Sequence, residues 1–171
     1  DYKKLDWFNG QYIRQKADTE LEELLIPYLK RASIVPEVLS QVEKEIIDGM
    51  IPLVKERLRL LPQITELVRF LFQDVPVSEP GALIPKRLDA VQTKMALVKG
   101  REILADFMER DDEGNEELFR KASEELGIKL GDILMPLRVS VTGSPSSPPL
   151  FGSMRLLGSE KTLFRVDRAI G

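Results

Sequence analysis

The segment 128–151 constrains the fold most strongly, because it joins a helical stripe to a stiff loop. Apolar residues in its first half recur at the spacing of one helix face: Leu130, Ile133, Leu134, Leu137 and Val141. Pro136 lies inside this stripe and should kink or loosen the helix, since proline lacks a backbone donor. Thr142 and Gly143 then end the helix, because glycine accepts a positive φ.

The loop that follows, SPSSPP at 144–149, holds three prolines and three serines. Each proline fixes φ, so the loop should be stiff and rich in polar groups. A short helix can start near Pro149 and place Leu150 and Phe151 beside the loop. Together with Arg138, these are the groups that hold unstacked bases. An ordinary helix–loop–helix corner with a surface arginine has the same spacing, and spacing alone favours that simpler interpretation.

The composition excludes several classes of chemistry. The chain contains no cysteine and no histidine, which rules out disulfides, thiol catalysis, histidine bases and the common zinc sites. It has no glycine-rich phosphate loop, and its carboxylates fall on the polar faces of predicted helices. No apolar run approaches a membrane span, and no signal peptide is evident. Because the chain begins at Asp1, we expect it to be a piece of a longer protein.

The charges are unevenly distributed along the chain. The formal net charge is −3, yet residues 128–171 carry six Lys/Arg against three Asp/Glu. A phosphate backbone responds to local positive potential, and acidic surface elsewhere limits non-specific binding. The last quarter of the chain is therefore the better candidate for contact with nucleic acid.

The N-terminal helical stretch is expected over Asp6–Arg14, where the poor helix pair Asn9–Gly10 marks a candidate break. Trp7 and Tyr12 supply apolar surface to this stretch. We favour the interpretation that they pack against a part of the protein outside this chain, in which case the first residues should be mobile.

The next helices have recognisable start signals. Thr19 and Glu22 have the spacing of a capping box. Pro36 suits the first turn of a third helix, which Gly49 and Pro52 should interrupt. The expected buried face of that third helix is Val38, Val42 and Ile46. Residues 53–61 follow as a basic segment, and Pro62 opens a helix with Ile64, Leu67, Val68 and Leu71 inward.

The second half continues the helical pattern. Ile84, Leu88, Val91, Met95 and Val98 should form one buried face. Asn115 should cap the following helix, which Gly127 ends. A last helix restarts near Gly158 with Leu163, Val166 and Ile170 inward.

No segment alternates like a strand, so the sequence predicts an all-α protein built from two small helical subdomains. The proline-containing stretch Asp74–Pro80 is the best internal boundary. We expect a leading segment at 1–17, a first subdomain at 18–76 and a second at 77–171.

Two long motifs resemble those of one enzyme family. GIKLGDILMPLRVSVTGSPSSPPLF (Gly127–Phe151) resembles the signature GxKxGxxxxPLRxxxTGxxxSPxLF of the anticodon-binding region of bacterial-type glutamyl-tRNA synthetases, which are class I aminoacyl-tRNA synthetases. KLDWFNGQYIR (Lys4–Arg14) resembles the family segment KLxWxNGxYIR, which follows the catalytic core. The motifs stand in the family's order, and the resemblance covers essentially the whole chain.

The resemblance implies a cytoplasmic, monomeric protein that binds tRNA-Glu and no membrane. ATP and Mg belong to the full-length ligase, so this piece should hold no cofactor and no catalytic residue. Ser147 stands where the family usually has threonine, so a methyl contact is lost there. The anticodon-binding positions implied are Arg57, Arg138, Ser147, Pro148 and Leu150.

Arg57 is the position implied to discriminate between anticodons, and its match rests on the weaker motif LVKERLRLLPQITEL. Further basic residues are candidate contacts to the tRNA backbone: Arg14, Lys161, Arg165 and Arg168. The last three recur at i, i+4 and i+7 of one predicted helix, a pattern that also fits a merely solvated face.

Two alternatives stay open. A helical protein-interaction module without an RNA role would have an exposed apolar groove and little salt dependence. A divergent paralogue could keep the fold and have lost its tRNA specificity. The sequence does not decide whether the parent enzyme discriminates tRNA-Glu from tRNA-Gln.

Overall fold

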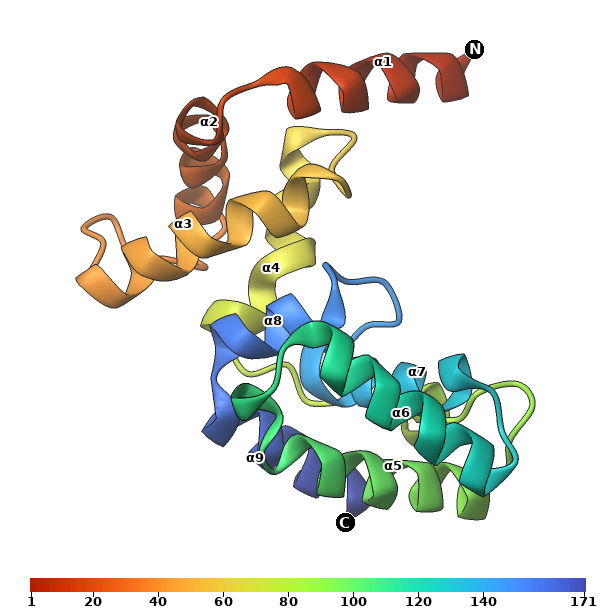
Figure 1. Ribbon diagram of the computed structural model, residues 1–171. Helices are drawn as coiled ribbons and strands as arrows, with labels where there is room; N and C mark the ends of the chain where they lie inside the picture. The colour runs from red at the N-terminus through yellow and green to blue at the C-terminus, as the bar shows by residue number, and fades with distance from the viewer. The chain divides into compact units, whose positions relative to one another are not determined.

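The computed structural model describes all residues 1–171, and they form helices without strands (Figure 1). The all-α prediction is confirmed. The α-helices are α1 (Tyr2–Gln15), α2 (Asp18–Arg31), α3 (Gln41–Lys55), α4 (Ile64–Phe72), α5 (Ala90–Leu104), α6 (Asp112–Leu126), α7 (Leu130–Thr142), α8 (Leu150–Leu157) and α9 (Ser159–Ile170). Short 3-10 turns occur at η1 (Leu61–Gln63), η2 (Pro80–Leu83) and η3 (Phe107–Glu109). None of the helices has the length and apolarity needed to cross a membrane.

The chain forms two compact units. Unit 1 contains Asp1–Asp74 and Ser146–Leu156, and unit 2 contains Val75–Pro145 and Leu157–Gly171. The division between Asp74 and Val75 falls at the start of the proline-containing stretch. The segment Ser146–Leu156, which we expected in the second subdomain, packs with unit 1.

Unit 1 is built on α2, α3 and α4, with α8 packed against α3. Two glycines allow this close approach. A Cβ on Gly49 would lie 2.5 Å from Leu156 Cδ2, and one on Gly152 would lie 2.7 Å from Leu53 Cδ2. The core residues with at most 1% exposure include Leu21, Leu25, Leu29, Ile47, Met50, Ile51, Val54 and Val68.

The predicted break in the first helix is wrong. Helix α1 runs unbroken through Asn9–Gly10. Gly10 is buried, and a Cβ there would lie 3.1 Å from Arg14 Nη1. The glycine therefore makes room for an arginine one turn later.

The predicted capping box at Thr19 and Glu22 is also wrong. Helix α2 begins at Asp18 after Ala17, which provides no side-chain cap. Lys55 of α3 holds this helix start instead: its Nζ donates to the Lys16 carbonyl and, at 2.8 Å, to Asp18 Oδ1. Because this contact joins residues far apart in the chain, local spacing could not indicate it.

The third helix begins later than predicted. Ser40 and Glu43 form its capping box, with Glu43 N–H donating to Ser40 Oγ at 3.2 Å and Ser40 N–H to Glu43 Oε2 at 3.1 Å. The expected face is wrong, since Val38 and Val42 are exposed. Neither Gly49 nor Pro52 interrupts α3, and its buried residues are Ile47, Met50, Ile51 and Val54.

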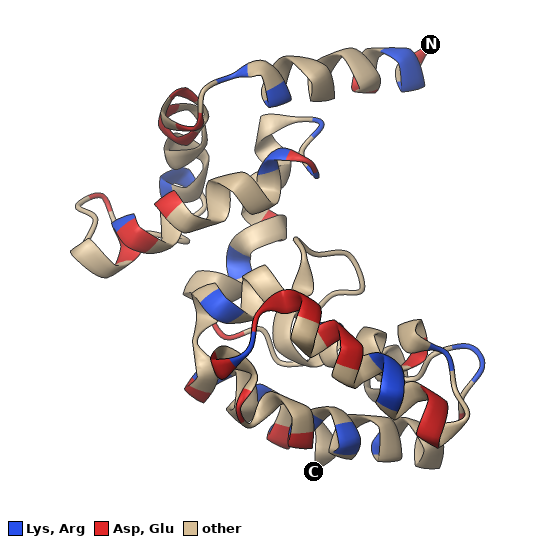
Figure 2. Ribbon diagram, viewed as in Figure 1, with Lys and Arg blue, Asp and Glu red and all other residues tan.

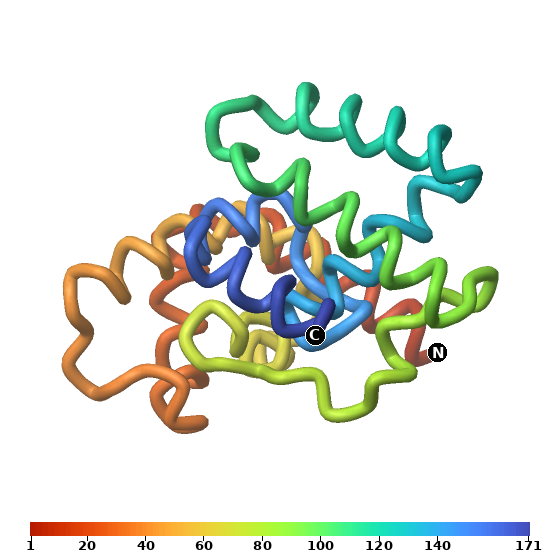
Figure 3. Tube along the Cα trace, turned by 90° about the horizontal axis from the view of Figure 1, so that it is seen from below, coloured from red at the N-terminus to blue at the C-terminus, as the bar shows by residue number.

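Unit 2 packs α5, α6, α7 and α9 together, and Figure 3 shows α6 lying beside α5. Helix α7 buries Ile133, Leu137 and Val141 of its predicted stripe, whereas Leu130 and Leu134 are half-buried, and it ends at Gly143, where φ is +76°. It continues through Pro136, whose carbonyl accepts a hydrogen bond from Ser140 Oγ at 2.6 Å. Helices α5 and α7 approach closely at Gly100, where a Cβ would lie 2.7 Å from Leu137 Cδ1.

Two predictions in unit 2 are wrong. Val91, Met95 and Val98 are exposed, and α5 buries the face with Ala96, Leu97, Gly100 and Leu104. The small residues on that second face permit the close contact with α7.

The cap of α6 is Asp111, not Asn115. Asn115 is buried, and its Oδ1 accepts a hydrogen bond from Arg110 Nε at 2.9 Å. Its Nδ2 donates to the Phe107 carbonyl at 3.0 Å.

The α5–α7 contact predicts opposite effects for two glycine substitutions. Gly100→Ala should destabilise the protein by ~1–3 kcal/mol, because fully buried Leu137 cannot retreat from the added methyl. Gly131→Ala in α7 has open space and should stabilise it by ~0.5 kcal/mol through backbone entropy. Urea unfolding of both variants measures the difference. Equal stability of the two variants would contradict close packing at Gly100.

The carboxyl of Glu22 predicts a pH dependence. Burial, together with a hydrogen bond to Asp48 and the nearby charges of Asp48 and Glu23, raises the pKa of Glu22 from 4.5 to about 7. The folded state therefore favours protonated Glu22. The resulting stability is complete below pH 4.5 and is lost as the pH rises through about 7.

Glu22→Gln should remove this dependence, because the amide remains neutral at every pH. The stability of the variant relative to wild type should increase between pH 5 and pH 8 in urea unfolding, whereas Glu20→Gln, at an exposed position of the same helix, serves as the control. A constant difference between Glu22→Gln and wild type across this range would refute the assignment.

Candidate nucleic-acid interface

Arg57 lies in a short, well-anchored turn after α3. Its backbone N–H donates to the Val54 carbonyl at 2.8 Å, and its side chain is exposed. Leu58 beside it is fully buried. Gln63 Oε1 accepts from the N–H groups of both Arg59 and Leu60 at 3.1 Å. The turn thus presents two arginine side chains on a backbone held from both ends.

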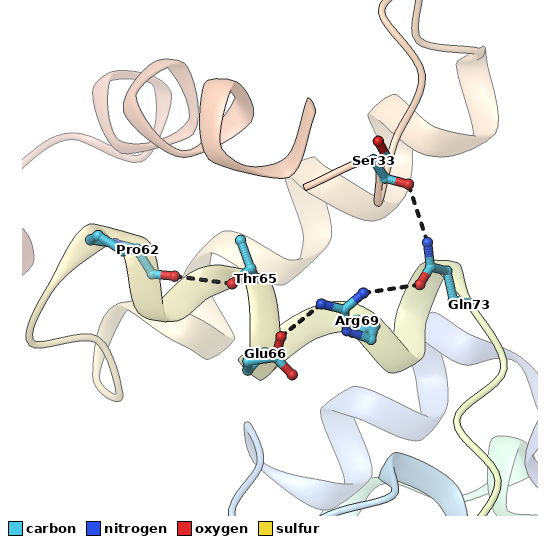
Figure 4. A network of polar contacts seen from close by, with 6 residues as sticks. All are labelled: Ser33, Pro62, Thr65, Glu66, Arg69 and Gln73. Carbon is cyan, nitrogen blue, oxygen red and sulfur yellow. Dashed lines mark hydrogen bonds and ion pairs between the residues drawn. The ribbon is translucent and has the colours of Figure 1, made fainter. Parts of the chain in front are cut away.

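A chain of polar contacts fixes α4, the helix that follows this turn (Figure 4). Thr65 Oγ1 donates to the Pro62 carbonyl at 3.1 Å. Arg69 pairs with Glu66 at 2.7 Å and donates to Gln73 Oε1 at 3.2 Å. Gln73 Nε2 donates to the Ser33 carbonyl at 3.2 Å, which ties the end of α4 to the segment after α2.

The loop residues Ser147, Pro148 and Leu150 belong to unit 1 and are buried. Ser147 Oγ donates to the Pro148 carbonyl at 2.8 Å. The exposed residues of the loop are Pro145, Ser146 and Pro149. Ser147 and Pro148 thus lie on the loop's inner side, and Leu150 begins α8. Sequence reasoning missed the exposed residues because the loop 144–149 contains only serine and proline.

Arg138 belongs to unit 2, on the last turns of α7, and is half-buried. Thr142 Oγ1 lies 2.7 Å from the Arg138 carbonyl and 2.9 Å from the Ser144 carbonyl. It also accepts a hydrogen bond from the Ser144 N–H at 3.3 Å. Thr142 therefore joins the Arg138 backbone to the start of the loop. Sequence patterns single out Thr142 only as part of a helix stop.

The predicted basic stripe on α9 contains one buried residue. Arg165 is 5% exposed, and its Nη1 donates to the Val141 carbonyl at 2.7 Å. This bond satisfies one of the free carbonyls at the end of α7. Lys161 and Arg168 are exposed, and the Arg168 guanidinium lies 5.5 Å from the Phe164 ring. Two of the three predicted residues therefore present charge to solvent.

Arg14 is half-buried on α1, beside Gly10. It shares unit 1 with Arg57 and the loop residues, whereas Arg138 and the α9 residues share unit 2. Figure 2 shows that acidic residues gather on α6, while basic residues occur at the end of α1 and in the turn after α3. Basic residues are therefore present in unit 1 at α1 and this turn despite the net charge of −3.

Comparison with known proteins identifies relatives that belong to one family. The anticodon-binding domain family matches residues 20–170. A glutamate–tRNA ligase of Treponema denticola is 43% identical over 99% of this chain and 37% of its own length. One from Borrelia recurrentis is 36% identical over 99% of this chain and 33% of its own length. The chain thus spans about a third of the length of these relatives.

A solved structure agrees with this comparison. The crystal structure of a glutamate tRNA ligase from Elizabethkingia meningosepticum, in complex with its amino acid, is similar with a TM-score of 0.63 and 25% identity. The similarity covers 96% of this chain and 31% of that one.

Arg165 and Lys161 should behave differently on substitution. Arg165→Ala should destabilise the protein by ~1–3 kcal/mol, because it leaves the Val141 carbonyl without its partner. Lys161→Ala should change stability by less than ~0.5 kcal/mol, as expected for an exposed site. Thermal and urea unfolding measure both values. Wild-type stability of Arg165→Ala would show that the guanidinium does not support α7.

Proposed function

Since the chain belongs to the glutamate–tRNA ligase family and comprises its anticodon-binding domain, we propose that it recognises the anticodon of tRNA-Glu. In the proposal, the rest of the longer ligase activates glutamate with ATP and attaches it to the tRNA. This chain supplies the contacts at the far end of the tRNA.

The anchored turn with Arg57 is the observation that carries the proposal. The side chain is exposed and makes no ion pair or hydrogen bond within the chain, while Leu58 and Gln63 hold its backbone. An arginine on a fixed backbone loses little conformational freedom when it binds, which favours a specific contact.

Arg57 is proposed to read the third anticodon base. Glutamate anticodons end in C, and glutamine anticodons end in G. The pairing edge of C offers the adjacent acceptors O2 and N3, whereas the edge of G offers two donors and one acceptor. Arginine has donors only, so it can bond to C but faces unpaired donors on G.

Arg138 is proposed to contact a second anticodon base by stacking and hydrogen bonding at once, as a planar guanidinium can. Ser147, Pro148 and Leu150 would then act by giving the loop its shape, which agrees with their burial. Lys161, Arg168 and Arg14 would attract the phosphate backbone.

One observation favours a second candidate, a protein-interaction module. Unit 2 carries an open apolar groove of about 460 Å³ whose lining includes Val91, Met95, Val98 and Leu126. In its lining, Lys99 Nζ forms ion pairs with Glu102 Oε2 at 3.7 Å and with Glu125 Oε2 at 3.6 Å.

A salt titration of binding to tRNA-Glu, tRNA-Gln and an unrelated tRNA separates the two candidates. Anticodon recognition requires affinity that favours tRNA-Glu and falls with salt. Equal and weak binding to all three tRNAs would overturn the proposal in favour of the interaction module.

Arg57→Gln tests the role of the turn. Glutamine has both a donor and an acceptor, so the preference for the C-ending anticodon loop should collapse. Since one wrong base typically costs ~1–3 kcal/mol, the wild-type preference should be roughly 5- to 150-fold. Binding of two anticodon stem-loops that differ only in the third base measures it.

The control is Arg87→Gln, which removes an exposed arginine in unit 2 and should leave the preference intact. A uniform loss of affinity of Arg57→Gln for both loops would mean that Arg57 contacts phosphate.

A further inference from the structure

We propose that unit 1 holds a nucleotide-binding pocket, separate from the proposed contact at Arg57, that receives an unpaired base of the bound tRNA. This inference rests on the proposed function. The pocket has a volume of about 290 Å³ and lies between α1, α2 and the turn leading into η1. Pockets that bury a drug-sized ligand measure ~300–1,000 Å³, so this one suits a single ring system.

The lining of the pocket suits a flat, partly apolar ring. Tyr12 of α1 and Tyr28 of α2 each contribute a ring to the lining, so the proposal replaces the packing outside this chain that the sequence suggested for Tyr12. Leu60 and Pro62 add apolar surface. Aromatic and apolar faces of this kind hold unstacked bases.

One polar group in the lining has no partner. Asn9 is half-buried, lines the pocket, and its amide makes no hydrogen bond within the chain. An amide offers both donors and an acceptor, which is what the edge of a base requires. A purely apolar side chain from a partner protein would leave this amide unsatisfied.

The charges around the pocket point to a nucleotide. Lys16 Nζ lies 4.2 Å from the centre of the Tyr12 ring, and the Arg31 guanidinium lies 4.7 Å from that of Tyr28. Arg59 lines the pocket with an exposed guanidinium. None of these three cations forms an ion pair in the chain. They complement the phosphates that flank a base.

Lys55 fixes the helices that form the walls of the pocket to one another. By bonding both the Lys16 carbonyl and Asp18, it fixes the end of α1 to α2 and α3. Figure 1 shows the resulting course of the chain, with α1 running above the turn that follows α3. Arg57 and Arg59 share this turn, so the pocket and Arg57 could contact the same tRNA loop.

The test uses the tRNA-Glu anticodon stem-loop with 2-aminopurine placed at one loop position at a time. Tyr12→Ala is the variant, and Tyr2→Ala is the matched control, because Tyr2 lies on the same helix, is 88% exposed and is outside the pocket. We expect one position whose fluorescence changes with wild type and Tyr2→Ala but not with Tyr12→Ala. The affinity of Tyr12→Ala should fall roughly 5- to 150-fold.

Arg59→Gln should weaken binding and reduce the salt slope by about one phosphate contact. The pocket is overturned if Tyr12→Ala binds the stem-loop with wild-type affinity and no 2-aminopurine position changes its fluorescence on adding the protein, even if the tRNA binds. An unchanged salt slope of Arg59→Gln would overturn the phosphate contact.

A mononucleotide titration separates this inference from the proposed function. If the wild-type chain fails to bind tRNA, the proposed function fails, and the pocket is then tested with AMP, GMP, CMP and UMP. Chemical-shift changes at Asn9 and Tyr12 on adding a mononucleotide would support the pocket. Their absence with all four would overturn it.

Discussion

The close approach of α3 and α8 is the contact that holds the segment Ser146–Leu156 in unit 1. Gly49 faces Leu156, and Gly152 faces Leu53, at separations that leave no room for a further methyl group. Each glycine faces a leucine of the other helix, and the segment Ser146–Leu156 packs with unit 1 although the residues on both sides of it belong to unit 2. Ser147, Pro148 and Leu150 lie within this segment and are buried.

Local charge, and not net charge, governs what the surface of each unit can bind. The chain is acidic overall, and much of that acidity lies on α6. Several cations of unit 1 have no carboxylate partner, among them Arg57, Arg59, Lys16 and Arg31. They surround an anchored turn and a pocket with aromatic walls. Since charges interact over about a Debye length of ~10 Å at 0.1 M salt, distant carboxylates do little to cancel them.

Sequence periodicity succeeded where one face of a helix is clearly more apolar than the others. Helix α7 buries Ile133, Leu137 and Val141 of its predicted stripe. Helix α4 buries Ile64, Val68 and Leu71 as expected, while the predicted Leu67 is half-buried. It failed where two faces are apolar. Helix α5 presents Val91 and Met95 on one side and Ala96 and Leu97 on the other, and only the second side has the small residues that let α7 approach.

The sequence by itself determined the all-α class, the helix stops at Gly127 and Gly143, and the location of the motifs that resemble the anticodon-binding family, because these depend on local backbone preferences and contiguous residues. Tertiary structure decided which members of a pattern reach solvent. Lys161, Arg165 and Arg168 look equivalent in spacing, yet the free Val141 carbonyl at the end of α7 draws Arg165 inward. Likewise, Lys55 donates to Asp18, 37 residues earlier, at the start of α2. Such long-range bonds form only after the helices pack, so no local pattern records them.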